Sequence, residues 1–318
     1  MGIENDAILS YLEDSARFAD LFNQFCFGGR EIVEPQKLTD ASEVYHTPPG
    51  RRRQRRQGIR DIKKRLESGV CLKILAVEAQ NDVNYIMPWR IMEYDCMEYG
   101  KQIRRIQNAN REAGEYASAG EFLCGFRRED RLVPVYTLCL YHGTGQWNGP
   151  RCLRDMADFG ADAPEWEQCF SDYPMRLICA SEPMDYTAFR TPLGALFELL
   201  PLRRDKTRLK KLMDENPIYQ KLDGDTAETA SILMGVNLFI KQTKKYKNGD
   251  GYNMCQAIKE MMEDSRTEGW EAGEKVGWEA GIRIFIQANR DDGLEDDAIA
   301  DKLRKYYGLA KKEVLKFL

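Results

Sequence analysis

Val70-Cys71-Leu72-Lys73-Ile74-Leu75-Ala76-Val77-Glu78-Ala79-Gln80 places an apolar run directly before the carboxylate of Glu78 and the amide of Gln80. Such a run predicts a strand that is central in a sheet. The preceding residues, from Ile59 to Leu66, predict a partner strand, and Glu67-Ser68-Gly69 predicts the turn of a hairpin. The expected fold of the first half of the chain is built outward from this hairpin.

Helices and further strands are predicted on both sides of the hairpin. Residues 7–27 carry apolar side chains at largely helical spacing and end at Gly28-Gly29, which predicts an opening amphipathic helix. Pro88 begins a second helix, up to about Asn108, that is expected to pack on the sheet. Strands are predicted at 132–141 and 175–180. The apolar residues of the second helix recur at three- and four-residue spacing: Trp89, Met92, Cys96, Tyr99, Ile103 and Ile106.

The order of these elements predicts an α/β fold, with a small mixed sheet flanked by helices and a mostly α-helical C-terminal region. We expect three parts: an α/β domain at 1–185, a helical extension at 186–264, and a charged helical tail at 265–318 that ends in a helix pair. The tail contains Gly-Trp-Glu-Ala-Gly at 269–273 and again at 277–281. This repeat favours a solvated or self-associating helix, so a homo-oligomer is expected to use this region.

Composition excludes several classes of protein. The chain has 318 residues and a formal net charge of −4, so a nucleic-acid partner must be bound by a local patch. No apolar run approaches the roughly 18 residues of a membrane helix, and no basic and apolar leader opens the sequence, so we expect neither a membrane span nor secretion. Nine scattered cysteines without a Cys-x-x-Cys pair favour reduced thiols in a cytoplasmic protein. His142 precedes Gly143-Thr144-Gly145 without the lysine of a phosphate-binding loop, and we expect it in an ordinary loop.

Asp61, Glu78 and Gln80 are the most informative polar residues of the predicted hairpin. Glu78 and Gln80 share a face of their strand, and Asp61 begins the partner strand, so one metal ion would touch both carboxylates. Two carboxylates with a carbonyl and water suit Mg²⁺, which lowers the pKa of an attacking water. A satisfied or solvent-facing pair is the alternative, although a carboxylate that follows a buried strand is less ordinary.

Basic residues are concentrated beside these carboxylates. Residues 51–65 contain nine Lys and Arg residues against one acid, Asp61. Neutralisation of phosphates by such a patch makes affinity fall steeply with salt. A solvated loop is the alternative, but the position beside the hairpin favours DNA contact by Arg51, Arg52, Arg53, Arg55, Arg56, Lys63 and Lys64.

Several motifs together resemble one known family. The most specific are Glu78-Ala79-Gln80 followed by Met87-Pro88-Trp89-Arg90-Ile91-Met92-Glu93-Tyr94-Asp95, and Leu132-Val133-Pro134-Val135 before Trp147-Asn148-Gly149-Pro150. Phe18-Ala19-Asp20-Leu21-Phe22-Asn23, the Arg60-Asp61 step and the Gly- and Glu-rich tail add to the similarity. Over most of its length the chain is similar to the Rpn family, the recombination-promoting nucleases or putative YhgA-like transposases.

This resemblance implies a PD-(D/E)XK nuclease core that cuts DNA with Mg²⁺, or with Mn²⁺ in its place. Asp61 takes the position of the motif's Asp and Glu78 that of its acidic partner, both as metal ligands, while Gln80 takes the lysine position. The chain departs from the pattern twice. Arg60 stands where the superfamily has Pro, and Gln80 lacks the positive charge of a lysine.

Arg90 and Lys101, on the helix that follows the hairpin, are the expected sources of the missing charge. Related families supply that charge from this helix, and Arg90, near its first turn, is the preferred phosphate clamp. A structural salt bridge is the alternative for Arg90. Asp20 resembles an acid of the opening helix that some members aim at the metal, so it is a provisional third ligand. A carboxylate on the helix surface is the alternative for Asp20.

The sequence thus predicts a metal-dependent DNA endonuclease, active without a covalent intermediate. Asp61 and Glu78 hold Mg²⁺, Gln80 orients the water, and Arg90 or Lys101 neutralises the phosphate. The alternative is a catalytically decayed relative that binds DNA or oligomerises through its helical tail. RNA is a weaker alternative substrate, since nothing in these residues indicates whether a 2′-hydroxyl is read.

Overall fold

The computed structural model describes residues 2–41, 62–68, 71–160, 163–235 and 244–318. The chain divides into two compact units, Met1–Cys255 and Gln256–Leu318. The first unit has a mixed five-stranded sheet with helices, and the second is helical. The predicted α/β class and helical C-terminal region are therefore confirmed, while the boundaries predicted at 185/186 and 264/265 remain predictions.

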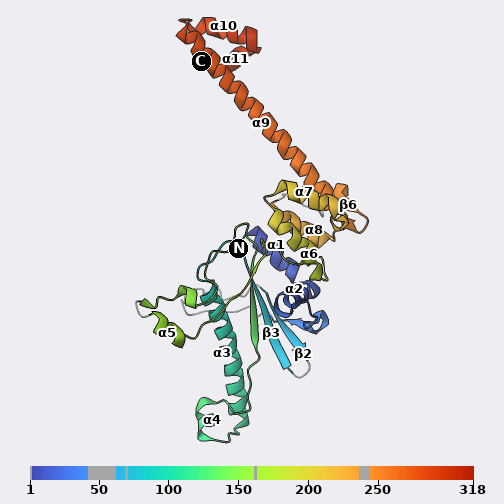
Figure 1. Cartoon of the computed structure of the whole chain (residues 1–318), viewed down its shortest axis with the longest axis vertical. Helices are drawn as coiled ribbons and strands as arrows, with labels where there is room; N and C mark the ends of the chain where they lie inside the picture. The colour runs from blue at the N-terminus through green and yellow to red at the C-terminus, as the bar shows by residue number, and fades with distance from the viewer. Residues whose placement is uncertain (1, 42–61, 69–70, 161–162, 236–243) are drawn as a thin grey trace. The chain divides into compact units, whose positions relative to one another are not determined.

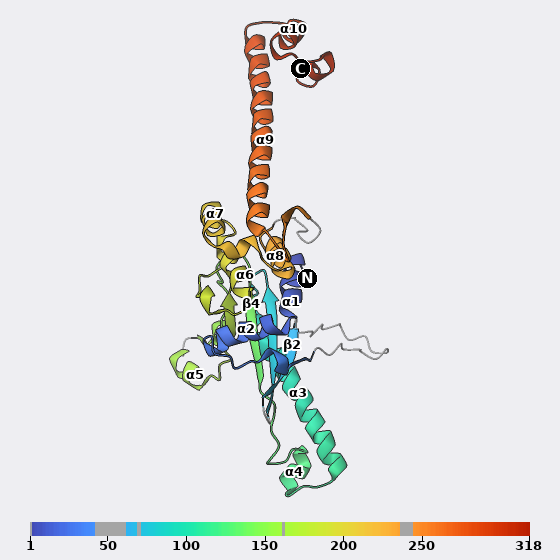
Figure 2. The same ribbon diagram turned by 90° about the vertical axis from the view of Figure 1, so that its right-hand side faces the viewer.

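The sheet has the strand order β1–β2–β3–β4–β5. The first two pairs of neighbouring strands are antiparallel and the last two are parallel. As predicted, β3 is the central strand, and it pairs with β2 from Ile62↔Val77 to Ser68↔Cys71 (Figures 1 and 2). The strands are β1 (Leu38–Asp40), β2 (Ile62–Ser68), β3 (Cys71–Gln80), β4 (Val135–Tyr141) and β5 (Arg176–Cys179).

Helices α2 (Ser15–Phe27) and α3 (Met87–Ala113) cover opposite faces of this sheet (Figure 1). Two consecutive residues of β2 show this, because successive side chains of a strand point to opposite faces. Lys63 Nζ lies 3.0 Å from a carboxylate oxygen of Glu98 in α3. Lys64 Nζ lies 5.7 Å from the ring centroid of Phe18 in α2. The sheet is therefore the middle layer of three.

The opening helix predicted at 7–27 is two helices, α1 (Ile3–Leu12) and α2. Asp14 separates them, because its carboxylate accepts hydrogen bonds from the backbone N–H groups of Ala16 and Arg17 and so caps a new helix. Gly28, at φ 62°, ends α2 in the left-handed conformation that a glycine adopts without strain, as its position in the sequence predicts.

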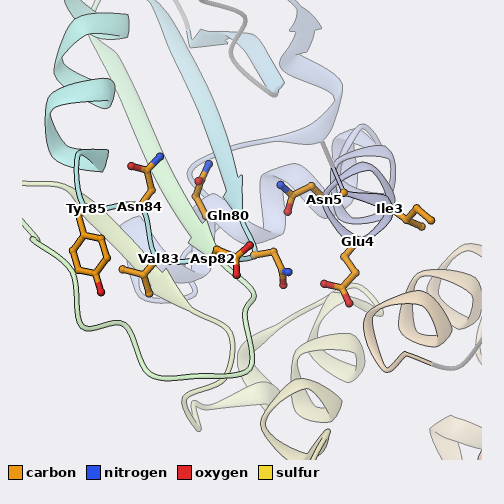
Figure 3. A pocket seen from close by; sticks show the side chains of 10 residues that line it. Ile3, Glu4, Asn5, Gln80, Asp82, Val83, Asn84 and Tyr85 are labelled. Carbon is orange, nitrogen blue, oxygen red and sulfur yellow. The ribbon is translucent and has the colours of Figure 1, made fainter.

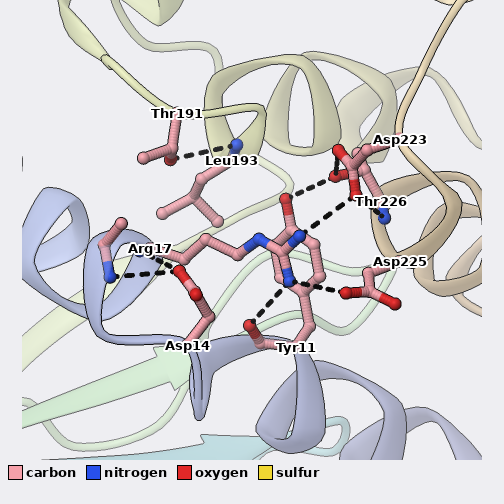
Figure 4. Close-up of polar contacts among 9 residues, drawn as sticks. Tyr11, Asp14, Arg17, Thr191, Leu193, Asp223, Asp225 and Thr226 are labelled. Carbon is pink, nitrogen blue, oxygen red and sulfur yellow. Dashed lines mark hydrogen bonds and ion pairs between the residues drawn. The ribbon is translucent and has the colours of Figure 1, made fainter. Parts of the chain in front are cut away.

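Arg17 ties these two helices to α8 (Gly224–Leu233). Its guanidinium lies 3.0 Å from Asp223 and 3.5 Å from Asp225, and it stacks 4.0 Å from the ring centroid of Tyr11 (Figure 4). The Tyr11 hydroxyl lies 2.8 Å from Thr226 Oγ1, and burial raises the pKa of this tyrosine. A hollow at this point is lined by Arg17 and the two aspartates that it contacts, together with Asp14, Thr191 and Pro192.

Helix α3 packs on the sheet, but through a different face from the predicted one. Trp89 and Cys96, expected to face the sheet, are exposed. The buried residues of α3 are instead Met87, Pro88, Ile91, Tyr94, Asp95, Glu98, Gln102 and Asn110, half of which are polar or charged. The buried polar groups have partners: Gln102 exchanges two hydrogen bonds with the backbone of Val133, and Asn110 donates to Asp130. The apolar spacing could not show this, because it ignores buried polar residues.

The remainder of the first unit is mostly short helices. Helix α8 ends at Leu233, and β6 (Lys247–Asn248) and β7 (Gly251–Tyr252) form a two-stranded hairpin. The other helices are α4 (Ala119–Cys124), α5 (Ala163–Cys169), α6 (Leu193–Leu199) and α7 (Lys206–Glu215), with 3₁₀ turns at Pro35–Lys37, Arg154–Met156, Tyr186–Ala188, Leu200–Leu202, Pro217–Gln220 and Lys244–Tyr246.

The second unit has its own core. Helix α9 (Met254–Asp291) runs from the end of the first unit through most of the second, and α10 (Asp296–Tyr307) and α11 (Lys311–Val314) pack on its C-terminal part. The buried apolar side chains are Ile282, Ile286, Ile299, Leu303, Leu309 and Val314. The helix pair predicted at the end of the chain is thus present. Among the described residues, no helix combines the length and the apolarity that crossing a membrane requires.

Candidate active site

Glu78 lies near the carboxyl end of β3, with its side chain facing α3. It shares a face of the strand with Ala76, and Ala76 pairs with Lys63, which contacts Glu98 of α3. Glu78 is in register with Cys139 of β4 and is 0 % exposed. The structure therefore excludes the solvent-facing alternative for Glu78.

Arg90, in the first turn of α3, brings a positive charge to Glu78. Its Nη2 lies 4.0 Å from Glu78 Oε2, and 28 % of its side chain remains exposed. The same nitrogen donates a 3.1 Å hydrogen bond to the hydroxyl of Tyr94, and the guanidinium lies 5.6 Å from the centroid of that ring. Arg90 therefore makes the salt-bridge contact that the sequence left open, while part of it faces solvent.

Lys63 and Lys101 meet at one carboxylate beside this pair. Their ammonium groups lie 3.0 and 3.7 Å from the same oxygen of Glu98. The side chains of Lys63 and Glu98 are only 8 % and 7 % exposed. Burial of charges is costly unless they are paired, so this cluster is fixed. Because two cations share one carboxylate, the cluster adds net positive charge on the face of the sheet to which Glu78 also points.

A second polar cluster between α3 and the sheet was not predicted. Asp95 accepts a 2.8 Å hydrogen bond from the hydroxyl of Thr137 on β4, and its other oxygen accepts one from the Tyr173 hydroxyl. Burial, reinforced by Asp95, raises the pKa of Tyr173, which keeps the phenol protonated as a donor. Asp95 closes the Met-Glu-Tyr-Asp motif, which is the one sequence signal that pointed to it. Tyr173 lies far away in the sequence and carried no signal.

Asp20, the provisional third ligand, serves the packing of α2. Its carboxylate accepts hydrogen bonds from the backbone N–H of Arg190 at 3.0 Å and from the N–H and hydroxyl of Thr191 at 2.8 and 2.6 Å. Asp20 lies on α2, and Glu78 faces α3 across the sheet. The structure therefore does not bring these two carboxylates together.

Lys63 and Lys64, predicted to contact DNA, are buried. Lys63 is paired with Glu98, and the ammonium of Lys64 lies 2.8 Å from the carbonyl oxygen of Glu13 and 2.9 Å from Asp40. A buried and paired ammonium is not presented to a DNA phosphate. Both lysines are thus corrected to structural ion pairs, because strand β2 alternates between two covered faces.

Asp61 and the basic residues of 51–56 lie outside the described residues. Ile62, which follows Asp61 in the sequence, pairs with Val77, which precedes Glu78. Within the part of the chain that the structure describes, no three His, Cys, Asp or Glu side chains are grouped closely enough to hold a metal ion. The donors available beside β3 are oxygens, the carboxylate of Glu78 and the amide of Gln80, which is the chemistry that Mg²⁺ prefers.

Gln80 ends β3 at the edge of an open hollow (Figure 3). Its amide donates a 2.8 Å hydrogen bond to the carbonyl oxygen of Ala79. Asn5 of α1 also lines the hollow, and its side-chain oxygen lies 2.6 Å from Nε2 of His142. His142, where the sequence favoured an ordinary loop residue, is fully buried just after β4. Burial, and then the charge of Arg203, lowers the pKa of His142 to about 4, so the imidazole is neutral near pH 7.

Comparison with known proteins adds nothing to this geometry, because no family model, no curated protein and no solved structure matches the chain.

Proposed function

We propose that the chain is a metal-dependent DNA endonuclease of the recombination-promoting nuclease type that its sequence resembles, with a PD-(D/E)XK core. One observation carries the proposal: a fully buried glutamate, Glu78, near the carboxyl end of the central strand of a mixed sheet, 4.0 Å from Arg90 of the following helix. Buried carboxylates with a charged neighbour are concentrated at functional sites.

Asp61 and Glu78 are the proposed metal ligands. The pairing of Ile62 with Val77 supports this choice, because these residues adjoin Asp61 and Glu78 in the sequence. When bound, Mg²⁺ or Mn²⁺ would lower the pKa of a water molecule and polarise the phosphodiester. Carboxylate and amide oxygens beside β3 fit these ions.

Arg90 or Lys101 supplies the positive charge that Gln80 lacks, and the buried Lys63 is paired with Glu98 on the same side of the sheet. The partly exposed guanidinium of Arg90 neutralises the phosphate in our proposal, since Arg binds phosphate in bidentate geometry. The two lysines lie on the same face and hold Glu98. Gln80 orients the attacking water by its amide. In this proposal the positive charge comes from α3, and the hydrogen bond to the water comes from Gln80 at the end of β3.

DNA is the proposed partner, contacted through Arg51, Arg52, Arg53, Arg55 and Arg56 of the sequence. A cytoplasmic location is part of the proposal, and the cysteines whose state the structure describes are free thiols. Self-association through the helical tail also remains a proposal.

Nicking of supercoiled plasmid with Mg²⁺ tests the function. Glu78→Gln preserves the shape of the side chain and removes its charge, and we expect a loss of more than about a hundredfold in rate. The matched control is Glu198→Gln, which changes another carboxylate that accepts hydrogen bonds, from Tyr219 and Asn216. It should nick like the wild type. Equal nicking by both variants, or none by the wild type with Mg²⁺ or Mn²⁺, would contradict the proposal.

The alternative function is DNA binding by a catalytically decayed relative. Gln80 in the lysine position is the observation that favours it. A calorimetric titration with Mn²⁺ separates the two functions. Binding that is lost in Glu78→Gln supports the nuclease, and no binding supports the decayed relative.

A further inference from the structure

An open hollow lies at the carboxyl ends of the parallel strands β3 and β4 (Figure 3). Its volume is about 770 Å³, and an adjoining hollow of about 590 Å³ shares Glu4, Asn81, Asp82, Val83 and Tyr85 with it. The walls come from the start of α1, from residues 80–85 and from residues 141–148. The first volume lies in the range of pockets that hold small organic groups, roughly 300–1,000 Å³.

The lining of the hollow suits a neutral group with many hydrogen-bonding atoms. Carboxamides are the most frequent polar side chains of the two hollows: Asn5, Gln80, Asn81, Asn84, Gln146 and Asn148. Two carboxylates, Glu4 and Asp82, are present, and no Lys or Arg is among its described lining residues. The described lining residues themselves therefore carry negative charge and no positive charge. Carboxamides and carboxylates are the side chains that pair with the edges of nucleobases.

The walls are held in place before any ligand binds. The Tyr85 hydroxyl donates a 3.2 Å hydrogen bond to Asn148, which joins the loop after β3 to the loop after β4. The same loops meet at Gly149, where a Cβ atom would lie 2.8 Å from Val83. Trp147 is buried beside them and donates to the carbonyl oxygen of Gly149 at 2.9 Å. A preformed site loses less entropy on binding.

Tyr85 supplies an aromatic face at this site. The residue is 57 % exposed and lines both hollows. An exposed ring fixed by its own hydroxyl is a stacking platform, and stacking of a base on an aromatic side chain contributes about 1–3 kcal/mol to binding. Tyr85 lies two residues before the start of α3, whose first turn carries Arg90.

We propose that this hollow holds one unstacked nucleobase of the DNA substrate, stacked on Tyr85 and hydrogen-bonded by the surrounding carboxamides. Gln80 connects the two sites, since it lines the hollow and shares a strand face with Glu78. In this proposal, the phosphate bound at Arg90 belongs to a nucleotide near the one whose base enters the hollow. The inference rests on the proposed function for the choice of DNA as the ligand. It adds a substrate class, DNA with an unpaired or readily extruded base.

Binding without metal tests the inference separately from cleavage. Two short duplexes are compared by fluorescence anisotropy in EDTA, one with a single bulged thymidine and one with a bulged abasic site that retains the sugar and phosphate. We expect the wild type to bind the thymidine bulge at least about fivefold more tightly. Tyr85→Leu should bring the two affinities together, and Tyr85→Phe should keep the difference because the ring remains.

Tyr306→Leu is the matched control, since Tyr306 is 66 % exposed and belongs to α10 of the other unit. It should retain the preference. Equal wild-type affinity for the two duplexes, or an equal loss of preference in Tyr306→Leu, would overturn the inference. A protein that nicks plasmid but shows no preference refutes only the inference. One that shows the preference but never nicks supports the inference and refutes only the nuclease.

Discussion

Glu78 Oε2 and Arg90 Nη2 lie 4.0 Å apart, between the central strand and the first turn of α3. The two side chains differ in exposure, at 1 % for Glu78 and 28 % for Arg90. The carboxylate is thus withdrawn from solvent while its cation reaches the surface. Such a pair keeps a buried charge compensated and places part of the guanidinium at the surface, where a phosphate can approach it.

Arg90→Met should destabilise the fold by about 1–2 kcal/mol. Removal of one member of a fully buried pair costs about 3–5 kcal/mol, and the partial exposure and long distance here reduce the effect. The double variant Arg90→Met/Glu78→Gln should recover part of the loss, because the carboxylate charge is gone. Urea unfolding of the four proteins near pH 7 measures the coupling. Additive effects of the two substitutions would show that the pair does not interact.

Lys63→Met should lower the free energy of unfolding by about 3 kcal/mol. The change leaves the buried carboxylate of Glu98 with the more distant ammonium of Lys101 as its cation. Lys37→Met is the matched control. Lys37 pairs with Glu34 at the surface, with 44 % and 41 % exposure, and its loss should cost at most about 1 kcal/mol.

Lys63→Met should also leave the salt dependence of DNA affinity unchanged. A lysine that neutralises a phosphate reduces the slope of log affinity against log salt by about one when it is removed. Lys63 is buried, so we expect no such reduction at temperatures where the variant is folded. A lower slope with unaltered stability would instead place Lys63 on DNA.

Local patterns predicted much of the fold. The apolar run before Glu78 correctly indicated the central strand, and its hairpin partner and the helix from Pro88 followed from equally local signals. The orientation of that helix did not follow, because its buried face carries Asp95 and Glu98, whose partners come from β2, β4 and the segment before β5. Apolar spacing detects a helix face that is buried through apolar contacts, but not one that is buried through hydrogen bonds and ion pairs.

The candidate site likewise combines residues that the sequence indicated with long-range contacts that it did not. Arg90 was chosen because the family resemblance implies a positive charge from this helix, and its guanidinium lies 4.0 Å from the Glu78 carboxylate. The role of Asp20 depends on Arg190 and Thr191, about 170 residues away, which no local pattern specifies. The burial of Lys64 likewise depends on Asp40 of a strand that was not predicted.

Asp20→Ala should destabilise the protein by about 2–4 kcal/mol. The change leaves the partly buried backbone N–H groups of Arg190 and Thr191 without their acceptor, at about 1–3 kcal/mol for each. Asp14→Ala, which removes the exposed cap of the same helix, should cost about 1 kcal/mol. Chemical denaturation compares the two. Weaker Mn²⁺ binding by Asp20→Ala at unchanged stability would restore Asp20 as a metal ligand.

His142 should make the fold less stable in mild acid. Burial, and then Arg203, lowers the pKa of His142 to about 4, against about 6.5 in an unfolded chain. Between these values the unfolded chain binds the proton more strongly. Stability from this group is therefore complete above about pH 6.5 and is lost as the pH falls toward 4, by about 2 kcal/mol at about pH 5.

Replacement of the imidazole isolates this contribution from the carboxylates that titrate in the same range. His142→Gln removes the titrating ring and retains an amide that can reach Asn5, the present partner of Nε2. Urea unfolding of both proteins at about pH 7.5 and about pH 5 gives the difference in acid sensitivity. We expect the variant to lose about 2 kcal/mol less than the wild type over this interval, whatever its stability at pH 7.5. Equal losses in the two proteins would mean that His142 binds its proton as readily in the folded chain as in the unfolded one.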